Sequence, residues 1–176
     1  MLPMIAGIRR KIAPLALIVS AALAAGCSVN YSFTGASISP DVETLSVQYF
    51  EDNSSSGFPG LSQQLTETMQ DEFEARTGLS LVGDMGDVDF EGEITDYKTE
   101  PVSVRADERA DQERLTITVR VIFTNSDDPD QDFERTFSRH ADYDAQTGLE
   151  AVEGELIEKI IDELIQDIFN YAFVNW

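Results

Sequence analysis

The sequence predicts an α+β domain in which two helices pack on one mostly antiparallel, roughly four-stranded sheet. Three observations favour this class. Alternating apolar and polar residues, which are typical of half-buried strands, fill the middle of the chain. A segment with apolar residues at helical spacing lies before these strands, and a longer one follows them. The chain is also long enough for one independent core. The expected element order is β-α-β-β-β-β-α.

The first half of the domain contains a strand, a helix and a second, brief strand. Residues 43–50 alternate, with Leu45, Val47 and Tyr49 expected on one face. Residues 59–77 then form an amphipathic helix that starts at a proline and ends before Gly78. A short strand is expected over residues 79–82. The apolar stripe of the helix consists of Leu61, Leu65, Met69 and Phe73.

The second half contains three strands and a long helix. Residues 88–94 and 115–123 alternate, a turn is expected over residues 125–130, and residues 133–143 form the return strand of a hairpin. The spacing of residues 147–150 predicts a capping box that opens the last helix. The wide apolar band of this helix indicates a core element, with an interface element as the alternative. Acids and a lysine interrupt the band, which argues against a membrane span.

The first 26 residues differ from the rest and predict a secretory leader. Arg9, Arg10 and Lys11 precede an apolar run from Ile12 to Gly26. Those residues would cover ~22 Å as a helix, which is short of the ~30 Å hydrocarbon core of a bilayer. A basic start, a short apolar segment and small residues at the end are typical of a signal peptide.

Cys27 directly follows the leader and predicts a lipoprotein. Residues 23–27 read Leu-Ala-Ala-Gly-Cys, which resembles a bacterial lipobox, in which the cysteine is lipidated after cleavage before it. Two or three acyl chains anchor a protein stably, because each buried methylene contributes ~0.8 kcal/mol. The alternative is an ordinary signal peptide with Cys27 as a bystander. We therefore expect a signal peptide over residues 1–26, a lipidated N-terminus and linker over 27–40, and a single domain over 41–176.

Composition excludes several functions. A single cysteine allows no internal disulfide and no cysteine-based metal site. Removing the three basic residues of the leader changes the formal charge from −21 to −24. Nucleic acid is excluded as a partner, because its phosphates require a basic surface. The acidic balance favours contacts with proteins over broad electrostatic capture of an anionic glycolipid.

Motifs that carry chemistry are missing from the sequence, so neither an enzyme nor a cofactor is expected. His140 is the only imidazole, and no nucleophile motif surrounds it. Nothing marks any two of the 33 acids as a glycosidase pair. Asp128, Asp130 and Asp132 have the opening spacing of a calcium loop, but the sixth and twelfth positions do not fit. A turn with solvated acids explains them, with weak calcium binding as the alternative.

The basic residues of the domain are concentrated between residues 98 and 139. Arg114 and Arg120 share strand parity with Thr116 and Thr118, on the face opposite the apolar one. One interpretation is that such residues gather into a local basic stripe, where guanidinium groups suit phosphate or carboxylate. For any single arginine, the favoured interpretation is pairing with neighbouring acids such as Glu113, Asp132 and Glu134. The candidate contact residues are Arg114, Thr116, Thr118, Arg120, Arg135 and Arg139.

Several stretches give the chain a resemblance to the LptE family of lipopolysaccharide-assembly lipoproteins, in a short and acidic form. The resemblance covers essentially the whole chain after the leader and depends on the order and spacing of the stretches. These are Cys27–Phe33, Pro59–Leu65, Phe90–Ile94, Arg114–Val119, Phe137–Tyr143, Asp167–Asn170 and Asn175–Trp176.

The resemblance implies a lipid-anchored subunit on the periplasmic side of the outer membrane. Such a subunit would plug the LptD β-barrel of the lipopolysaccharide translocon and assist its assembly, and would contact barrel wall or lipopolysaccharide. It also implies an α+β fold, in agreement with the pattern. Two other classes stay open: a lipoprotein adaptor or activator of a cell-wall synthase, and a periplasmic carbohydrate-active enzyme that uses a carboxylate pair.

Overall fold

Three long strands form the centre of the sheet, because their apolar residues alternate with polar ones. The computed structural model describes residues 38–55, 58–102 and 112–174. In it β5 (Gln112–Asn125) lies between β4 (Val88–Pro101) and β6 (Phe133–Asp144) and pairs antiparallel with both. A short 3-10 helix, η1 (Pro129–Gln131), lies in the turn between β5 and β6. The expected hairpin is confirmed, and β4 is longer than expected.

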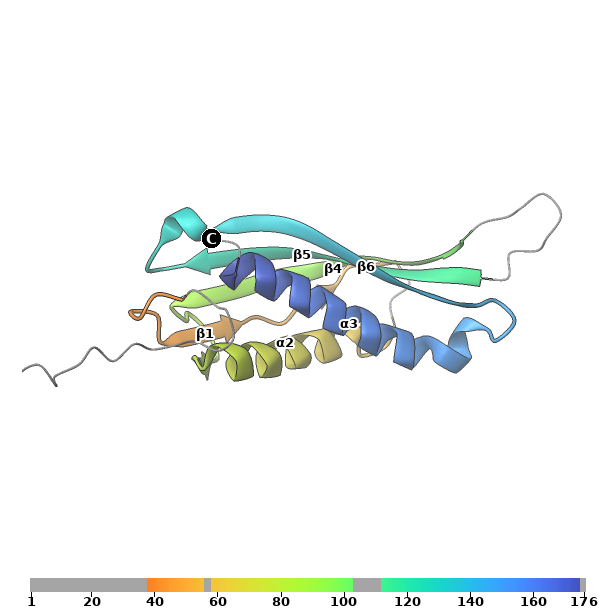
Figure 1. The fold of residues 1–176 in the computed structure, drawn as a ribbon, viewed down its shortest axis with the longest axis horizontal. Coiled ribbons are helices and arrows are strands. Elements are labelled where there is room, and N and C mark those ends of the chain that lie inside the picture. Colours follow the sequence, from red (N-terminus) through yellow and green to blue (C-terminus); the bar gives the residue numbers. More distant parts are fainter. Residues whose placement is uncertain (1–37, 56–57, 103–111, 175–176) are drawn as a thin grey trace, which may run out of the picture. The chain divides into compact units, whose positions relative to one another are not determined.

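Three short strands add parallel pairings that the sequence pattern did not predict. β1 (Thr44–Val47) lies between β3 (Ser80–Val82) and β4, and β2 (Glu51–Asp52) pairs with β4 further along. The sheet of the described domain therefore has six strands, in the order β3-β1-β4-β5-β6 with β2 beside β4 (Figure 1). The α+β class is confirmed, but the sheet is mixed. The reason is that α2 (Leu61–Thr77) follows β2 and precedes β3, and a helical crossover of this kind connects parallel strands.

The expectation for Tyr49 is wrong. Val47 pairs with Phe90 and Glu51 pairs with Glu93, so the β1–β2 segment takes one residue more than β4 over the same distance. An extra residue reverses which side chains face the core. Tyr49 is consequently 61% exposed, and Phe50 is fully buried in its place.

Both helices end near their expected positions, but their starts differ. α2 (Leu61–Thr77) follows Gly60 and ends at Gly78, whose φ of 73° is the left-handed cap that glycine allows. α3 (Leu149–Phe173) starts after Gly148, and no side chain caps its first turn. The predicted capping box is therefore wrong: the backbone N–H of Thr147 closes a turn on the carbonyl of Asp144 instead.

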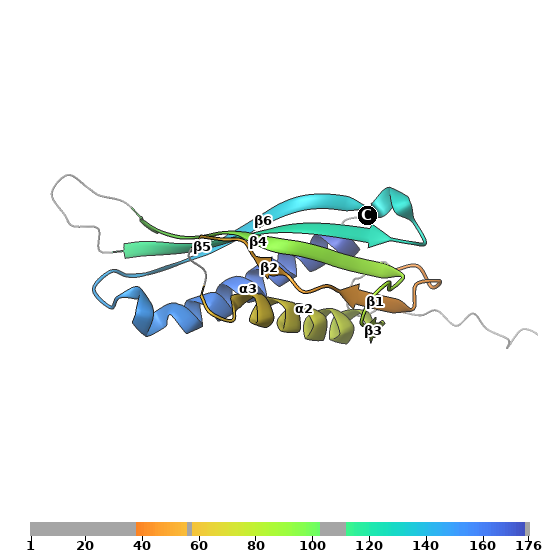
Figure 2. The same cartoon turned by 180° about the vertical axis from the view of Figure 1, so that it is seen from behind.

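The core lies between the helices and the sheet, and both helices cover the same face of the sheet (Figures 1 and 2). The predicted stripe of α2 is buried, and so is the apolar band of α3 from Leu156 to Phe173, with Leu149 and Val152 partly buried. This confirms α3 as a core helix. Five phenylalanine rings meet edge to face or tilted where the helices cross β4 and β5, with centroids 4.8–6.0 Å apart. They are Phe73, Phe90, Phe123, Phe169 and Phe173.

Candidate binding face of the sheet

The face of the sheet turned away from the helices carries the polar side chains of β4, β5 and β6. We call it the outer face. On β5 it presents Arg114, Thr116, Thr118 and Arg120, as the parity of the strand predicts. No described helix covers this face (Figures 1 and 2). Four of the six candidate contact residues therefore lie together on one accessible surface.

Arg114 forms a two-pronged ion pair across the β5–β6 ladder. Its register partner is Asp142, and the two guanidinium nitrogens Nε and Nη2 donate to the carboxylate at 2.6 and 2.9 Å. These hydrogen bonds hold the pKa of Asp142 below its ordinary value. Such fork-to-fork geometry is the strongest form of an exposed ion pair.

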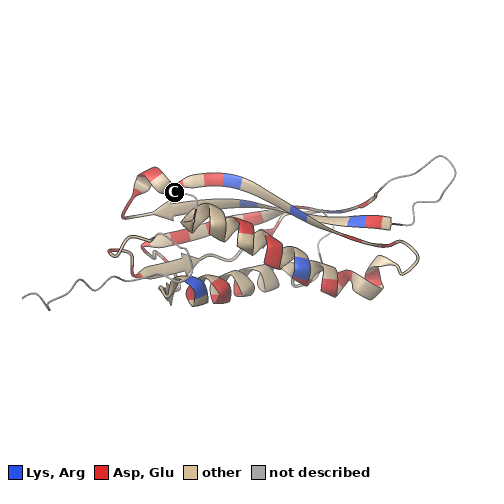
Figure 3. Cartoon of the chain, viewed as in Figure 1, with Lys and Arg blue, Asp and Glu red and all other residues tan. Residues whose placement is uncertain are grey.

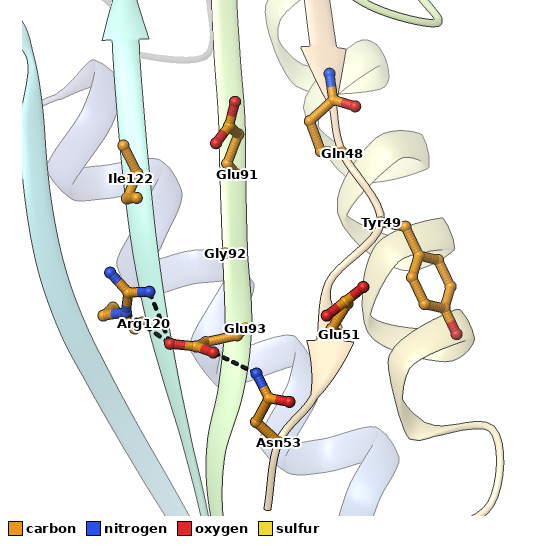
Figure 4. A pocket seen from close by; sticks show the side chains of 9 residues that line it. All are labelled: Gln48, Tyr49, Glu51, Asn53, Glu91, Gly92, Glu93, Arg120 and Ile122. Carbon is orange, nitrogen blue, oxygen red and sulfur yellow. Dashed lines mark hydrogen bonds and ion pairs between the residues drawn. The ribbon is translucent and has the colours of Figure 1, made fainter.

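Arg120 bridges both neighbouring strands. Its guanidinium donates to Glu93 of β4 at 2.7–2.8 Å and to Glu134 of β6 at 2.8 Å. The side-chain amide of Asn53 also donates to Glu93 (Figure 4). The pKa of Glu93 is lowered first by the Asn53 amide and then by Arg120.

Hydroxyl groups lie between these two ion-pair groups. The hydroxyls of Thr118 and Ser138 are 3.0 Å apart across the ladder. Thr116 lies opposite Lys98 on β4 and His140 on β6, and the Lys98 ammonium is 3.3 Å from Glu100. The outer face thus carries two groups of ion pairs with hydroxyls between them, and the register places more acids than basic residues on it, so a basic stripe is not present. The favoured pairing with acids is observed for Arg120, whose partner Glu134 is one of the acids named for it. Figure 3 shows acidic and basic positions next to each other on the long strands.

Arg135 and Arg139 do not belong to this face. Their register partners are the buried residues Val121 and Ile117, so both arginines point to the helix side of β6. Arg139 donates twice to Asp167 of α3 at 2.6 Å, and the guanidinium of Arg135 lies 4.3 Å from the centre of the Tyr171 ring. The expectation of one surface with all four arginines is therefore wrong. The signal was in the sequence, since Arg135 and Arg139 share parity with the apolar residues of their own strand.

An open depression of about 260 Å³ adjoins the outer face beside β2, and the sequence did not indicate it. Its lining includes Arg120 and Glu93 together with Glu51, Asn53 and the exposed ring of Tyr49 (Figure 4). The displacement of Tyr49 to the surface creates it. No simple sequence signal marks such a site, because it depends on the extra residue between β1 and β2.

The aspartates of the β5–β6 turn serve as backbone caps. A side-chain oxygen of Asp132 accepts from the N–H of Asn125 at 2.7 Å, and Asp128 accepts from the N–H of Asp130 at 3.3 Å. Among the described residues, no group of three or more His, Cys, Asp or Glu side chains is arranged to hold a metal ion. His140 lies exposed on the outer face. The lipidation site expected at Cys27 lies outside the described residues.

Within the described ranges, no helix is both long and apolar enough to cross a bilayer. The two-layer fold and its polar outer face define a class of small α+β domain with an extended sheet surface suited to binding. Residues 42–172 match the model of the LptE family, described as lipopolysaccharide-assembly. The chain belongs to this family.

One solved structure supports the fold, and two others are similar to the chain. A hypothetical protein from Chlamydia trachomatis superposes with a TM-score of 0.53 at 9% identity, over 74% of this chain and 98% of that one. A minor lipoprotein from Acinetobacter baumannii gives a TM-score of 0.48 at 17% identity, over 73% and 91% of the two chains. The rare lipoprotein B from Shewanella oneidensis gives 0.47 at 12%, over 73% and 90%. No curated protein matches the chain.

Proposed function

We propose that this protein is the lipid-anchored subunit of a lipopolysaccharide translocon, which plugs an LptD-type outer-membrane β-barrel and assists its assembly. The observation that carries the proposal is the family match, which spans nearly the whole described domain. The lipobox sequence ending at Cys27 supports an acyl anchor. Such an anchor holds the domain on the periplasmic side of the outer membrane, close to the barrel.

The outer face supplies the contact surface in this proposal. Its ion pairs and hydroxyls form a polar lattice without a described helix above it, which suits a barrel wall or the polar part of lipopolysaccharide. Charged groups that already have partners contribute specificity more than raw affinity. The domain therefore acts by shape and by matched polar contacts, in keeping with its acidic composition.

Purification from detergent-solubilised outer membranes tests the partner. With a C-terminal tag on the full chain, we expect one abundant partner, a β-barrel of the LptD type, in near-equal amount. Retrieval of a cell-wall synthase would instead favour an adaptor role. An outer-membrane-anchored protein that retrieves no barrel would contradict the proposal. A Cys27→Ala variant should lose its membrane association, and retention of the association would remove the acyl anchor from the proposal.

Charge reversal tests direct contact with lipopolysaccharide. We expect Arg114→Glu combined with Arg120→Glu to weaken binding by about fivefold to thirtyfold, since each of the two charged contacts contributes ~0.5–1 kcal/mol. Arg76→Glu combined with Lys159→Glu is the matched control, because it changes net charge equally but lies on the helices. Equal effects of the two pairs would exclude the outer-face arginines from a specific lipopolysaccharide site.

A further inference from the structure

Among the described residues, β6 has the longest stretch of backbone without a neighbouring strand. β6 is the terminal strand of the sheet and pairs with β5 along its whole length without a register shift. No described backbone segment pairs with its other edge. Unpaired edges are templates for another strand, and proteins usually blunt them with prolines, lysines, bulges or short strands. β6 contains no proline, lysine or bulge, and the charges of Glu134 and Asp142 on its outer face are paired with arginines of β5.

On the opposite side of the sheet, the free stretches are short or blunted. Beyond Ile94, β4 has no described strand on this side. That stretch, however, contains a register shift directly after Ile94, and it also contains Lys98 and Pro101.

β3 is only three residues long. Where β1 continues past it, the hydroxyl of Thr66 accepts from the N–H of Phe50 at 3.1 Å, and the amide of Gln70 donates to the carbonyl of Val47 at 3.0 Å. Both side chains belong to α2, which therefore closes this edge. The long free edge of β6 therefore differs from the opposite edge of the sheet.

The register identifies which groups of β6 are free. The N–H of Ser126 donates to the carbonyl of Asp87 directly opposite, so the even-numbered residues of β5 point their backbone groups at β4. The odd-numbered residues of β5 then bond to the odd-numbered residues of β6, their register partners. Five even-numbered residues of β6 consequently direct their N–H and C=O groups outward, and all five are exposed. They are Glu134, Thr136, Ser138, His140 and Asp142.

The two arginines on the helix side of β6 do not block this edge. Arg139 is drawn onto Asp167 and Arg135 onto the ring of Tyr171, both on α3. Inward charges protect an edge when they are unpartnered next to it, because an added strand would bury them. Here each charge already has its partner on the helix.

A second copy of the chain is disfavoured at this edge in the registers with the greatest overlap. In an antiparallel pair of β6 strands, these registers are centred on Ser138 and Arg139. The first places Glu134 opposite Asp142, and the second places Glu134 opposite Asp144. Like charges directly opposite each other destabilise a strand pair. The charge pattern therefore disfavours self-pairing and leaves a strand of another protein.

We propose that β6 accepts an extended strand of the barrel partner by β-strand addition, with main-chain hydrogen bonds to the outward groups of residues 134–142. This inference rests on the proposed function for the identity of the partner. The added strand should carry hydroxyl or basic side chains beside Glu134 and Asp142. On its other face it should carry apolar side chains beside Phe133 and Phe137, which are partly buried and buried respectively.

Proline substitution at outward positions tests the proposal. Proline removes an N–H that β6 does not use for its own sheet, so Thr136→Pro and His140→Pro should leave the domain folded. With the tagged full chain as bait, we expect the double proline variant to retrieve about tenfold less barrel, because two main-chain hydrogen bonds are lost. Thr136→Ala with His140→Ala keeps both N–H groups and should retrieve barrel within about twofold of the unmodified protein.

A crosslink covers the case in which the proline variant fails to fold. A photoreactive residue at Ser138 should join the protein to the barrel, whereas one at Glu67, on the exposed side of α2, should not. Undiminished retrieval by a folded proline variant, or a barrel crosslink at Glu67 and not at Ser138, would overturn strand addition while the proposed function stands. Failure of the unmodified bait to retrieve a barrel would overturn both.

Discussion

At the scale of single residues, Gly92 occupies a position that has no room for a side chain. A Cβ there would overlap both the carbonyl oxygen of Arg120 and the ring of Phe50. Phe50 is fully buried and covers the glycine from the core side. The ring and the glycine therefore form one packing unit, which exists only because the β1–β2 segment gains a residue.

We expect Gly92→Ala to lower the free energy of unfolding by about 1–3 kcal/mol, as overpacking in a well-packed core does. Gly154→Ala is the control, since Gly154 lies in α3 with open space around it and alanine favours a helix by ~1 kcal/mol. Urea titrations of both variants measure the difference. A Gly92→Ala protein as stable as the parent would show that Phe50 does not pack as described.

The side chain of Asp87, just before β4, forms hydrogen bonds with the start of β1. Its carboxylate accepts from the hydroxyl of Thr44 at 2.7 Å and from the N–H groups of Glu43 and Thr44 at 3.0 and 2.9 Å. These bonds, chiefly that of the Thr44 hydroxyl, lower the pKa of Asp87 below its ordinary value of 3.8. The stabilisation is therefore complete above pH 3.8 and is lost as the pH falls through the lowered pKa.

Asp87→Asn should consequently reduce stability at pH 7 and flatten its decline on acidification. Thermal unfolding of parent and variant between pH 7 and pH 2 checks this, with the two curves converging at the acid end. Asp71→Asn, on the exposed side of α2, should leave the decline unchanged. A constant gap between the Asp87→Asn and parent curves down to pH 2 would contradict the assignment.

At the scale of elements, the buried ring of Phe73 anchors α2 in the domain more strongly than the caps at the two ends of the helix do. Phe73 is fully buried and meets Phe90, Phe169 and Phe173 edge to face, with its ring centroid 4.9–6.0 Å from theirs. It thereby joins α2 to β4 and to α3 at once. Neither end of the helix has a comparable anchor, since no side chain caps its N-terminus.

Truncating this ring should be costly. We expect Phe73→Ala to destabilise the domain by about 3–5 kcal/mol, and the neighbouring exposed Glu74→Ala to change stability by less than ~0.5 kcal/mol. Guanidinium unfolding followed by circular dichroism measures both. A loss below about 1 kcal/mol at Phe73 would mean that α2 is anchored elsewhere.

The sequence predicted the elements better than their pairing. Periodicity located both helices and the long strands, because alternation and helical spacing follow directly from which faces are buried. The parallel pairings of β1, β2 and β3 were missed, since strands of two to four residues carry too little pattern to show their partners. Only two of the four candidate arginines lie on the outer face, for a related reason. Parity placed Arg114 and Arg120 correctly, and the same rule applied to β6 separates Arg135 and Arg139 from them.

At the scale of the whole molecule, the described domain has two different sides. Helices bury one face of the sheet, and the other face shows a lattice of paired charges that ends at the free edge of β6. The formal charge of −21 over the full chain is reflected on the outer face, where acids outnumber basic residues although Arg114 and Arg120 are both paired with acids. Under the proposed function, this side of the domain would contact its partner through fitted polar contacts and through backbone pairing along β6.

Depletion of the protein in its own cells tests this account most directly. If the chain serves lipopolysaccharide assembly through a barrel partner, depletion should leave the barrel misassembled and lower the lipopolysaccharide on the outer leaflet, and the full chain supplied in trans should restore both. The amount of folded barrel on semi-native gels and the labelling of surface lipopolysaccharide give the two readings. A normally folded barrel with undiminished surface lipopolysaccharide after depletion would contradict the proposed function.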